Sequence, residues 1–160
     1  MDEQITGVSV PLYDRAYLLS PQKRNQVMAL WEVQKYGADT FADPEYTCIY
    51  GMRPAEWYER GIRLLARTTV ECVRDALGDV IGQDVEHILH GAPPAAGVTV
   101  IDPFAGSCNS LYWILRHVPA SRGIAFEVDD VIFDMTRKNI GTLDRPIKLL
   151  HGDCRLLLPA

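Results

Sequence analysis

Three acidic residues each follow a short apolar run in the C-terminal half of the sequence. The runs are rich in Val, Ile and Leu, and their continuous hydrophobicity is typical of strands buried on both faces of a parallel sheet. Acids at the ends of such strands are placed to meet a ligand at the carboxyl edge of the sheet. The runs cover residues 98–101, 124–126 and 147–151, and the acids that follow are Asp102, Glu127 and Asp153.

A turn of small residues follows the first acid. The sequence Asp102-Pro103-Phe104-Ala105-Gly106-Ser107 breaks the strand, and its small side chains let the backbone come close to a ligand. Residues 109–117 then carry Leu111, Ile114 and Leu115 on one side, which predicts a helix. The amide-rich start of this helix is expected to face the ligand.

The second acid has a spacing with a chemical meaning. Glu127 lies about twenty residues beyond the turn, the distance at which a strand-helix-strand unit returns a carboxylate to the ribose of a nucleotide. The sequence therefore predicts a nucleoside-binding edge rather than three unrelated strand ends.

The turn resembles the cofactor loop of class I S-adenosylmethionine-dependent methyltransferases, in the form found in those that methylate exocyclic amines of nucleic-acid bases. Gly152-Asp153 is similar to the family's Gly-Asp step, whose carboxylate accepts from the adenine amine. Where the family usually has a second glycine this chain has Cys108, which we expect to crowd the cofactor or the helix packing. The resemblance implies S-adenosylmethionine as cofactor, bound by Asp102, Pro103, Phe104, Ala105, Gly106, Ser107, Asn109, Glu127, Val128, Asp153 and Cys154.

The expected fold is α/β, with a partial Rossmann-like methyltransferase sheet of three parallel strands after an N-terminal helical region. Residues 1–97 form that region and its linker, and residues 98–160 form the cofactor-binding half. Pro and Gly signals predict the helical segments. These comprise an irregular lead-in over 1–19, helices from Pro21 to Gly37, over 54–77 and over 79–90, a linker over 91–97, and a capped helix over 131–139.

No catalytic residue is predicted. Asp43-Pro44-Glu45-Tyr46 is similar to the family's Asp-Pro-Pro-Tyr motif, but too few residues separate it from the cofactor loop for a permuted enzyme. The turn at residues 50–52 has two interpretations, a wall for the methionine end of the cofactor or ordinary helix-entry chemistry. His87 and His90 lack further ligands, so no metal site is expected.

Composition bounds the class of protein. The chain has 160 residues and a net charge of −5, so it lacks the broad basic surface of proteins that grip phosphate backbones alone. No signal-like or membrane-spanning apolar run is seen, which favours a cytoplasmic protein away from the membrane. The cysteines are scattered without a Cys-x-x-Cys pair, which argues against disulfides and zinc. They are Cys48, Cys72, Cys108 and Cys154.

The leading hypothesis is the cofactor-binding portion of a methyltransferase that acts on a base amine in DNA or RNA. The alternatives are a small-molecule enzyme that uses the same cofactor, or a non-catalytic cofactor-binding subunit. In the family's topology the first strand is central, so three strands alone leave it as an open apolar edge. We therefore expect self-association or a partner chain that completes the sheet.

Overall fold

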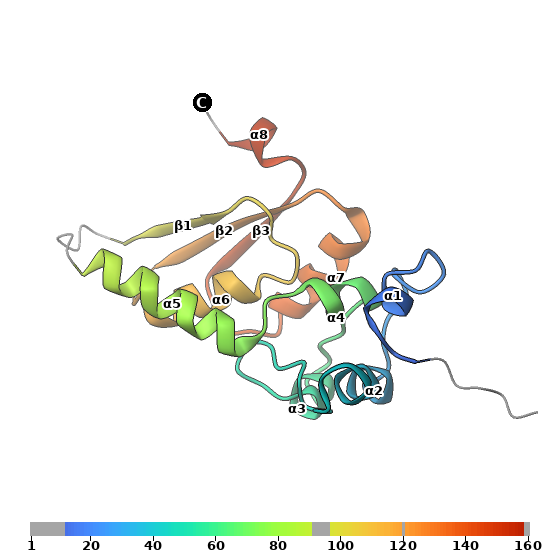
Figure 1. Ribbon diagram of the computed structural model, residues 1–160. Helices are drawn as coiled ribbons and strands as arrows, with labels where there is room; N and C mark the ends of the chain where they lie inside the picture. The colour runs from blue at the N-terminus through green and yellow to red at the C-terminus, as the bar shows by residue number, and fades with distance from the viewer. Residues whose placement is uncertain (1–11, 91–96, 120, 159–160) are drawn as a thin grey trace, which may run out of the picture.

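Three parallel strands form one sheet in the computed structural model, which describes residues 12–90, 97–119 and 121–158 (Figure 1). The strands β1 (Thr99–Asp102), β2 (Arg122–Glu127) and β3 (Ile147–His151) lie in sequence order. Their register pairs Asp102 with Ala125 and Glu127 with His151. The expected α/β fold with a partial Rossmann-like sheet is confirmed. The expectations for residues 1–11 and 91–96 lie outside the described residues.

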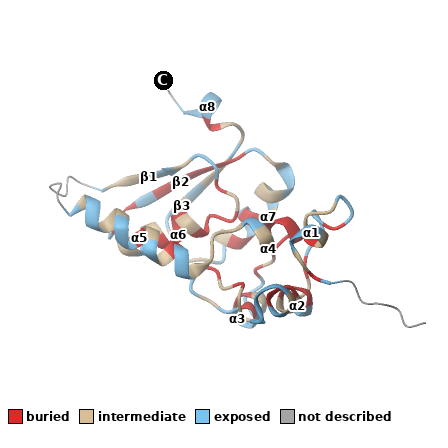
Figure 2. Ribbon diagram, viewed as in Figure 1, coloured by how far each residue is buried: buried red, intermediate tan, exposed pale blue. Residues whose placement is uncertain are grey.

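The two connecting helices pack on one side of this sheet (Figure 1). They are α6 (Asn109–His117) and α7 (Asp130–Ile140), so the predicted helices over 109–117 and 131–139 are confirmed to within a residue. Apolar side chains of α6 and of the inward sheet face form a shared core. Figure 2 colours the ribbon by burial and marks buried stretches in α6 and β2. Its buried members are Ala105, Cys108, Leu111, Leu115 and Ala125.

The N-terminal region is helical, as predicted, but its helices have other bounds. They are α1 (Arg15–Leu18), α2 (Leu30–Phe41), α3 (Pro54–Glu59), α4 (Ala66–Glu71) and α5 (Asp75–Leu89). Among the described residues, no helix has both the length and the apolarity needed to cross a bilayer.

The prediction of one helix over 54–77 is wrong because Gly61 ends α3. Gly61 has a φ of +85°, a conformation that glycine adopts at little cost. The amides of Gly61 and Ile62 donate to the carbonyls of Tyr58 and Trp57, which is the Schellman pattern of a helix C-terminus. The chain then runs extended before α4 starts.

The predicted helix from Pro21 to Gly37 is confirmed only from Leu30, and α2 continues past Gly37 to Phe41. Its first part is wrong, because residues before Leu30 pair with that extended stretch. The Met28 amide donates to the Leu64 carbonyl, and the Ala66 amide donates to the Gln26 carbonyl. These bonds satisfy backbone groups that a helix would otherwise pair within itself. The pairing fixes where α4 begins.

The sequence predicts that Gly78 ends a helix, and this is wrong. Gly78 lies inside α5, where α5 meets α6. A Cβ at Gly78 would lie 2.5 Å from Cδ1 of Trp113, and a Cβ at Gly82 would lie 2.5 Å from Cδ2 of His117. Both glycines therefore serve close helix packing. Trp113 also donates from Nε1 to Oδ1 of Asp75, 2.7 Å away.

Asn109 joins the N-terminal region to the sheet half. Its side chain is 1% exposed, and Oδ1 accepts from the Tyr50 amide at 2.8 Å. Its Nδ2 donates to the Val73 carbonyl at 2.8 Å and to Oδ1 of Asp75 at 3.1 Å. Tyr50 in turn donates its hydroxyl to the Ser107 carbonyl. The first turn of α6 and the turns around α4 are thus one hydrogen-bonded unit.

The sheet has an open edge and an exposed outer face. Within the described sheet β1 pairs with β2 alone. On the face away from α6, Ile101, Arg122 and Lys148 are exposed. Two further apolar side chains lie bare near the carboxyl ends of the strands, with Phe104 85% and Leu156 83% exposed.

We expect Asn109→Ala to lower the free energy of unfolding by about 2–3 kcal/mol, because buried amide, carbonyl and carboxylate groups lose their partner. Denaturant unfolding measures the change. Asn25→Ala is the control, since Asn25 is exposed, and should stay within about 0.5 kcal/mol of wild type. Equal losses in the two variants would contradict the linking role of Asn109.

The exposed edge leads us to expect that the chain self-associates or pairs with another polypeptide, because proteins seldom leave an apolar strand edge bare. Sedimentation over a concentration series, together with hydrogen exchange of residues 98–102, measures this. A monodisperse monomer whose amides in that strand exchange slowly would contradict the expectation.

Candidate functional site

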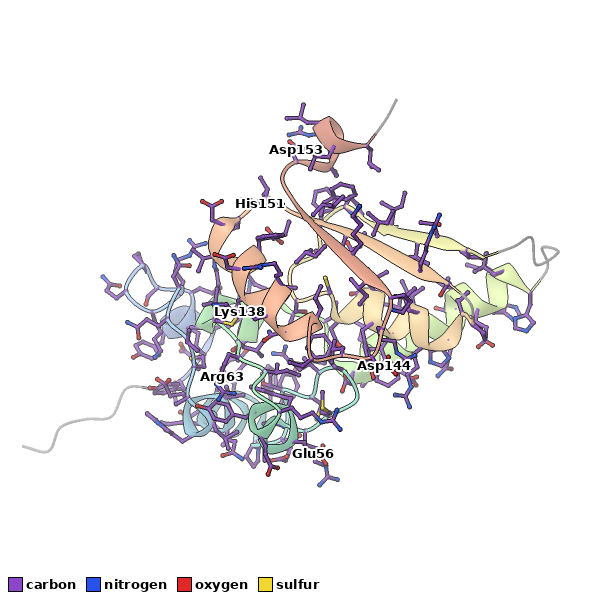
Figure 3. The ribbon with its side chains drawn as sticks, turned by 180° about the vertical axis from the view of Figure 1, so that it is seen from behind. Glu56, Arg63, Lys138, Asp144, His151 and Asp153 are labelled. Carbon is purple, nitrogen blue, oxygen red and sulfur yellow. The ribbon has the colours of Figure 1, made fainter. Side chains whose placement is uncertain are left out.

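Two adjoining pockets lie at the carboxyl ends of the strands. The larger has a volume of about 670 Å³ and the smaller about 110 Å³. Glu71, Phe104, Gly106 and Ile132 line both, so the two form one branched cavity. Its size falls in the range of small-molecule and cofactor sites. Figure 3 shows Asp153 beyond the end of β3, and Asp153 lines the larger pocket.

The structure brings most of the predicted site residues together. The larger pocket is lined by Pro103, Phe104, Gly106, Glu127, Val128, Asp153 and Cys154. The smaller pocket adds Ala105, Ser107 and Asn109.

Asp102 is the remaining predicted residue, and neither lining includes it. Its Oδ1 accepts from the Phe104 amide at 3.0 Å and so holds the start of the turn. Burial raises the pKa of this carboxyl, the Phe104 amide opposes the rise, and the charge of Glu127 adds to it. Whether Asp102 contacts a ligand stays a prediction.

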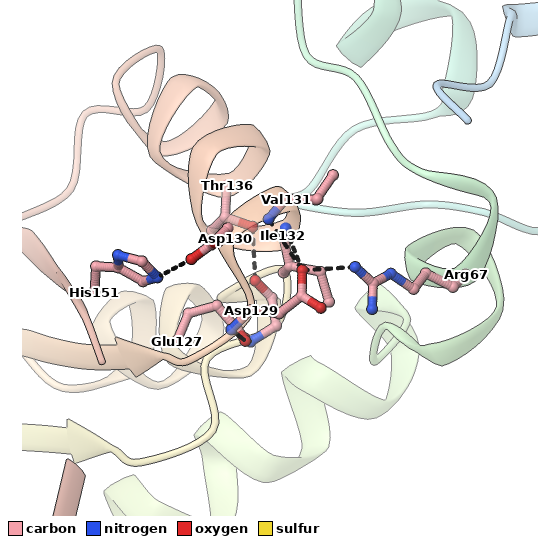
Figure 4. A network of polar contacts seen from close by, with 9 residues as sticks. Arg67, Glu127, Asp129, Asp130, Val131, Ile132, Thr136 and His151 are labelled. Atoms are coloured by element: carbon pink, nitrogen blue, oxygen red, sulfur yellow. Dashed lines mark hydrogen bonds and ion pairs between the residues drawn. The ribbon is translucent and has the colours of Figure 1, made fainter. Parts of the chain in front are cut away.

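Glu127 holds the loop after β1 through its carboxylate. The residue is 8% exposed, and its Oε2 accepts from the Gly106 amide at 3.0 Å while Oε1 accepts from the Asp129 amide at 2.9 Å (Figure 4). Thr136 donates from Oγ1 to the Gly106 carbonyl at 2.7 Å. A carboxylate has about four lone-pair directions, so Glu127 can still accept from the hydroxyls of a ligand.

Gly106 presents bare backbone to the cavity. Its φ is +48°, and a Cβ placed there would have no protein atom within 4 Å. Because Gly106 lines both pockets, a side chain at this position would occupy the space where a ligand could approach the backbone. The loop therefore leaves room for a ligand to lie close to its main chain.

Asp153 offers an ionised carboxylate to the larger pocket. It caps α8 (Cys154–Leu157) by accepting from the Arg155 amide at 2.9 Å, and the Arg155 guanidinium lies 3.0 Å away at Nε. Bonds from the Arg155 side chain, then from its amide, lower the pKa of Asp153 to about 2. The Asp153 carboxylate is therefore ionised at neutral pH and can accept a hydrogen bond from an amine.

Cys108 occupies the glycine-like position of the loop without crowding the cavity. Its φ is +59°, and its side chain is fully buried with Leu111, Leu115 and Ala125. Neither pocket lining includes it, so the expected crowding of the ligand is not found, and the sulfur packs under α6 instead. Burial above all raises the pKa of the thiol, which therefore stays neutral.

Helix α4 supplies site residues that sequence reasoning missed. Thr68 and Cys72 line the smaller pocket, and Glu71 lines both. The Thr68 hydroxyl is buried without a hydrogen-bond partner among the described residues, which marks it as a group that a ligand can satisfy. No sequence signal pointed to these positions, because they follow the end of α3 at Gly61, which the sequence did not predict.

Two segments considered from sequence lie outside both pocket linings. Tyr50 is 2% exposed and supports the loop from behind, which favours the structural interpretation of the turn at 50–52. Tyr46 stacks on Phe41 with ring centroids 3.5 Å apart, at the end of α2. In the part of the chain that the structure describes, no group of three or more potential metal ligands occurs.

No protein-family model and no curated protein matches this sequence. Among solved structures the chain is similar to one described as "Crystal structure of a putative O-methyltransferase from Klebsiella pneumoniae". The sequence identity is 17% and the TM-score is 0.43, over 64% of this chain and 42% of that chain. This chain thus spans less than half of that protein, and a likeness at this level does not extend to activity or substrate.

We expect Cys108→Gly to leave ligand affinity unchanged and to alter the free energy of unfolding by less than about 1 kcal/mol. Relief of the left-handed backbone, about 1–2 kcal/mol, offsets the loss of a small buried side chain. The matched control is Ala125→Gly, which loses burial in the same core without a positive φ and should be the more destabilised variant. A collapse of affinity in Cys108→Gly would show that the sulfur supports the ligand.

Proposed function

We propose that this chain is the cofactor-binding portion of an S-adenosylmethionine-dependent methyltransferase. The supporting observation is that the glycine loop after β1, the acid after β2 and the acid after β3 converge on one cavity. These groups have the chemistry that an adenosine moiety requires, namely open backbone, a ribose acceptor and an amine acceptor.

Each wall of the cavity has a proposed role. Glu127 accepts from the ribose hydroxyls, Asp153 accepts from the adenine amine, and Val128 and Cys154 flank the ring. At the smaller pocket Glu71 pairs with the ammonium of the methionyl end, and the unpartnered Thr68 hydroxyl binds its carboxylate.

The bound cofactor supplies a methyl group on a sulfonium, so the protein contributes mainly proximity and orientation. The acceptor that we propose is an exocyclic amine of a nucleic-acid base, a choice that rests on the Asp-Pro-Phe-Ala-Gly-Ser sequence alone. The net charge of −5 favours a small-molecule acceptor instead, because a protein that grips a phosphate backbone is usually basic. In either case we propose that residues beyond this sheet, from a partner chain or a second copy, complete the acceptor side.

The test of this function is binding of S-adenosylhomocysteine, measured by calorimetry and by thermal unfolding. A ligand that binds the folded state alone raises the melting temperature by mass action. No shift at millimolar ligand would remove the cofactor assignment. Methyl transfer to oligonucleotides and to small amines, assayed in parallel, separates the two acceptor classes, and binding without any transfer would favour a non-catalytic subunit.

Glu127→Gln should weaken binding of S-adenosylhomocysteine by about 1–3 kcal/mol, because ribose hydroxyls lose a charged acceptor. Asp153→Asn should weaken binding less, since an adenine amine at the open end of the cavity can turn to water. Asp134→Asn, an exposed change on α7, is the control and should bind as wild type. Equal affinity in wild type and Glu127→Gln would mean that this acid only holds the loop.

A further inference from the structure

Arg67 is a buried cation in the first turn of α4. Its side chain is 7% exposed, and its guanidinium donates to Oδ1 of Asp129 at 2.6 Å (Figure 4). Its backbone amide donates to the Arg24 carbonyl at 3.0 Å, so the turn before α2 holds the start of α4 in place. The ion pair connects the N-terminal region to the turn between β2 and α7.

Asp129 links Arg67 to Glu127, the acid proposed to bind the ribose. Its Oδ1 also accepts from the amides of Val131 and Ile132 and so caps α7. Its own amide donates to Oε1 of Glu127, whose other oxygen holds the Gly106 amide. The Arg67 hydrogen bond is the main reason that the pKa of Asp129 is lowered, and this carboxylate is therefore ionised at neutral pH.

The same ion pair also positions α4, which lines the cavity. Thr68 follows Arg67 directly and Glu71 lies one turn further along α4, and both face the cavity. Arg67 and Asp129 are absent from both pocket linings, so neither is placed to touch the ligand. Because a buried charge without its partner is strongly unfavourable, the pair holds α4 against the β2–α7 turn.

We propose that Arg67 is a positioning residue for the cofactor: through Asp129 it orients Glu127 toward the ribose and holds α4 over the cavity. The identity of the ligand rests on the proposed function. The contacts from Arg67 through Asp129 to Glu127 do not. The proposal predicts that ligand affinity depends on the Arg67 side chain, although this side chain lies outside the cavity. It also predicts that lysine at position 67 keeps part of that affinity.

The experiment measures S-adenosylhomocysteine binding by calorimetry in wild type, Arg67→Met and Arg67→Lys, at a temperature where all three are folded. We expect Arg67→Met to lose about tenfold or more in affinity, equivalent to about 1.4 kcal/mol, and Arg67→Lys to recover part of that loss. Hydrogen exchange without ligand should show faster exchange of the Gly106 and Asp129 amides in Arg67→Met, with β2 unchanged. A purely structural role would lower the melting temperature without this selective change.

Arg137→Met is the matched control, because it removes a surface ion pair with Asp134 on α7 and should leave affinity and both amides unaffected. Wild-type affinity in Arg67→Met, or unchanged exchange of the two amides, would overturn the proposal. If Arg67→Met does not fold, Arg67→Lys and Asp129→Asn provide the same comparison. If wild type itself does not bind the ligand, the proposed function fails, and exchange of the two amides alone decides whether Arg67 orders Glu127.

Discussion

The carboxylate of Glu127 is the constraint on which the site depends. A carboxylate removed from water needs hydrogen-bond donors, and here they are the backbone amides of Gly106 and Asp129. The loop after β1 and the turn after β2 must therefore close on one point at the sheet edge. This arrangement holds the loop before any ligand arrives, and it leaves the carboxylate oriented for a second set of donors.

The N-terminal region is the second wall of the site rather than an appendage. Asn109 binds Tyr50, Val73 and Asp75 from within the first turn of α6, while Arg67 reaches Asp129 from α4. Side chains of α6 also enter the buried cluster of the N-terminal helices. Because these contacts are buried, a displacement of α4 would be felt at the loop, which connects the packing of the region to ligand affinity.

The sheet itself is protected unevenly. Its inner face is packed by α6 and α7, whereas Ile101 on the outer face, Leu156 after β3 and Phe104 at the cavity are exposed. Apolar surface next to a ligand site commonly marks the position of another component, either a substrate or a protein surface.

Short-range patterns in the sequence by themselves determined the three strands, α6, α7 with its capped start, and the acids at the sheet edge, because strand hydrophobicity, helical spacing and capping are local properties. Tertiary structure alone decided which glycines end helices and which serve packing: Gly61 stops α3, whereas Gly78 lies where α5 meets Trp113. It also decided that residues 24–28 pair with 64–67, which places Thr68 and Glu71 at the cavity and Arg67 behind it. The physical reason is that pairing between segments about forty residues apart, like the packing that buries Cys108, depends on partners that no local pattern identifies.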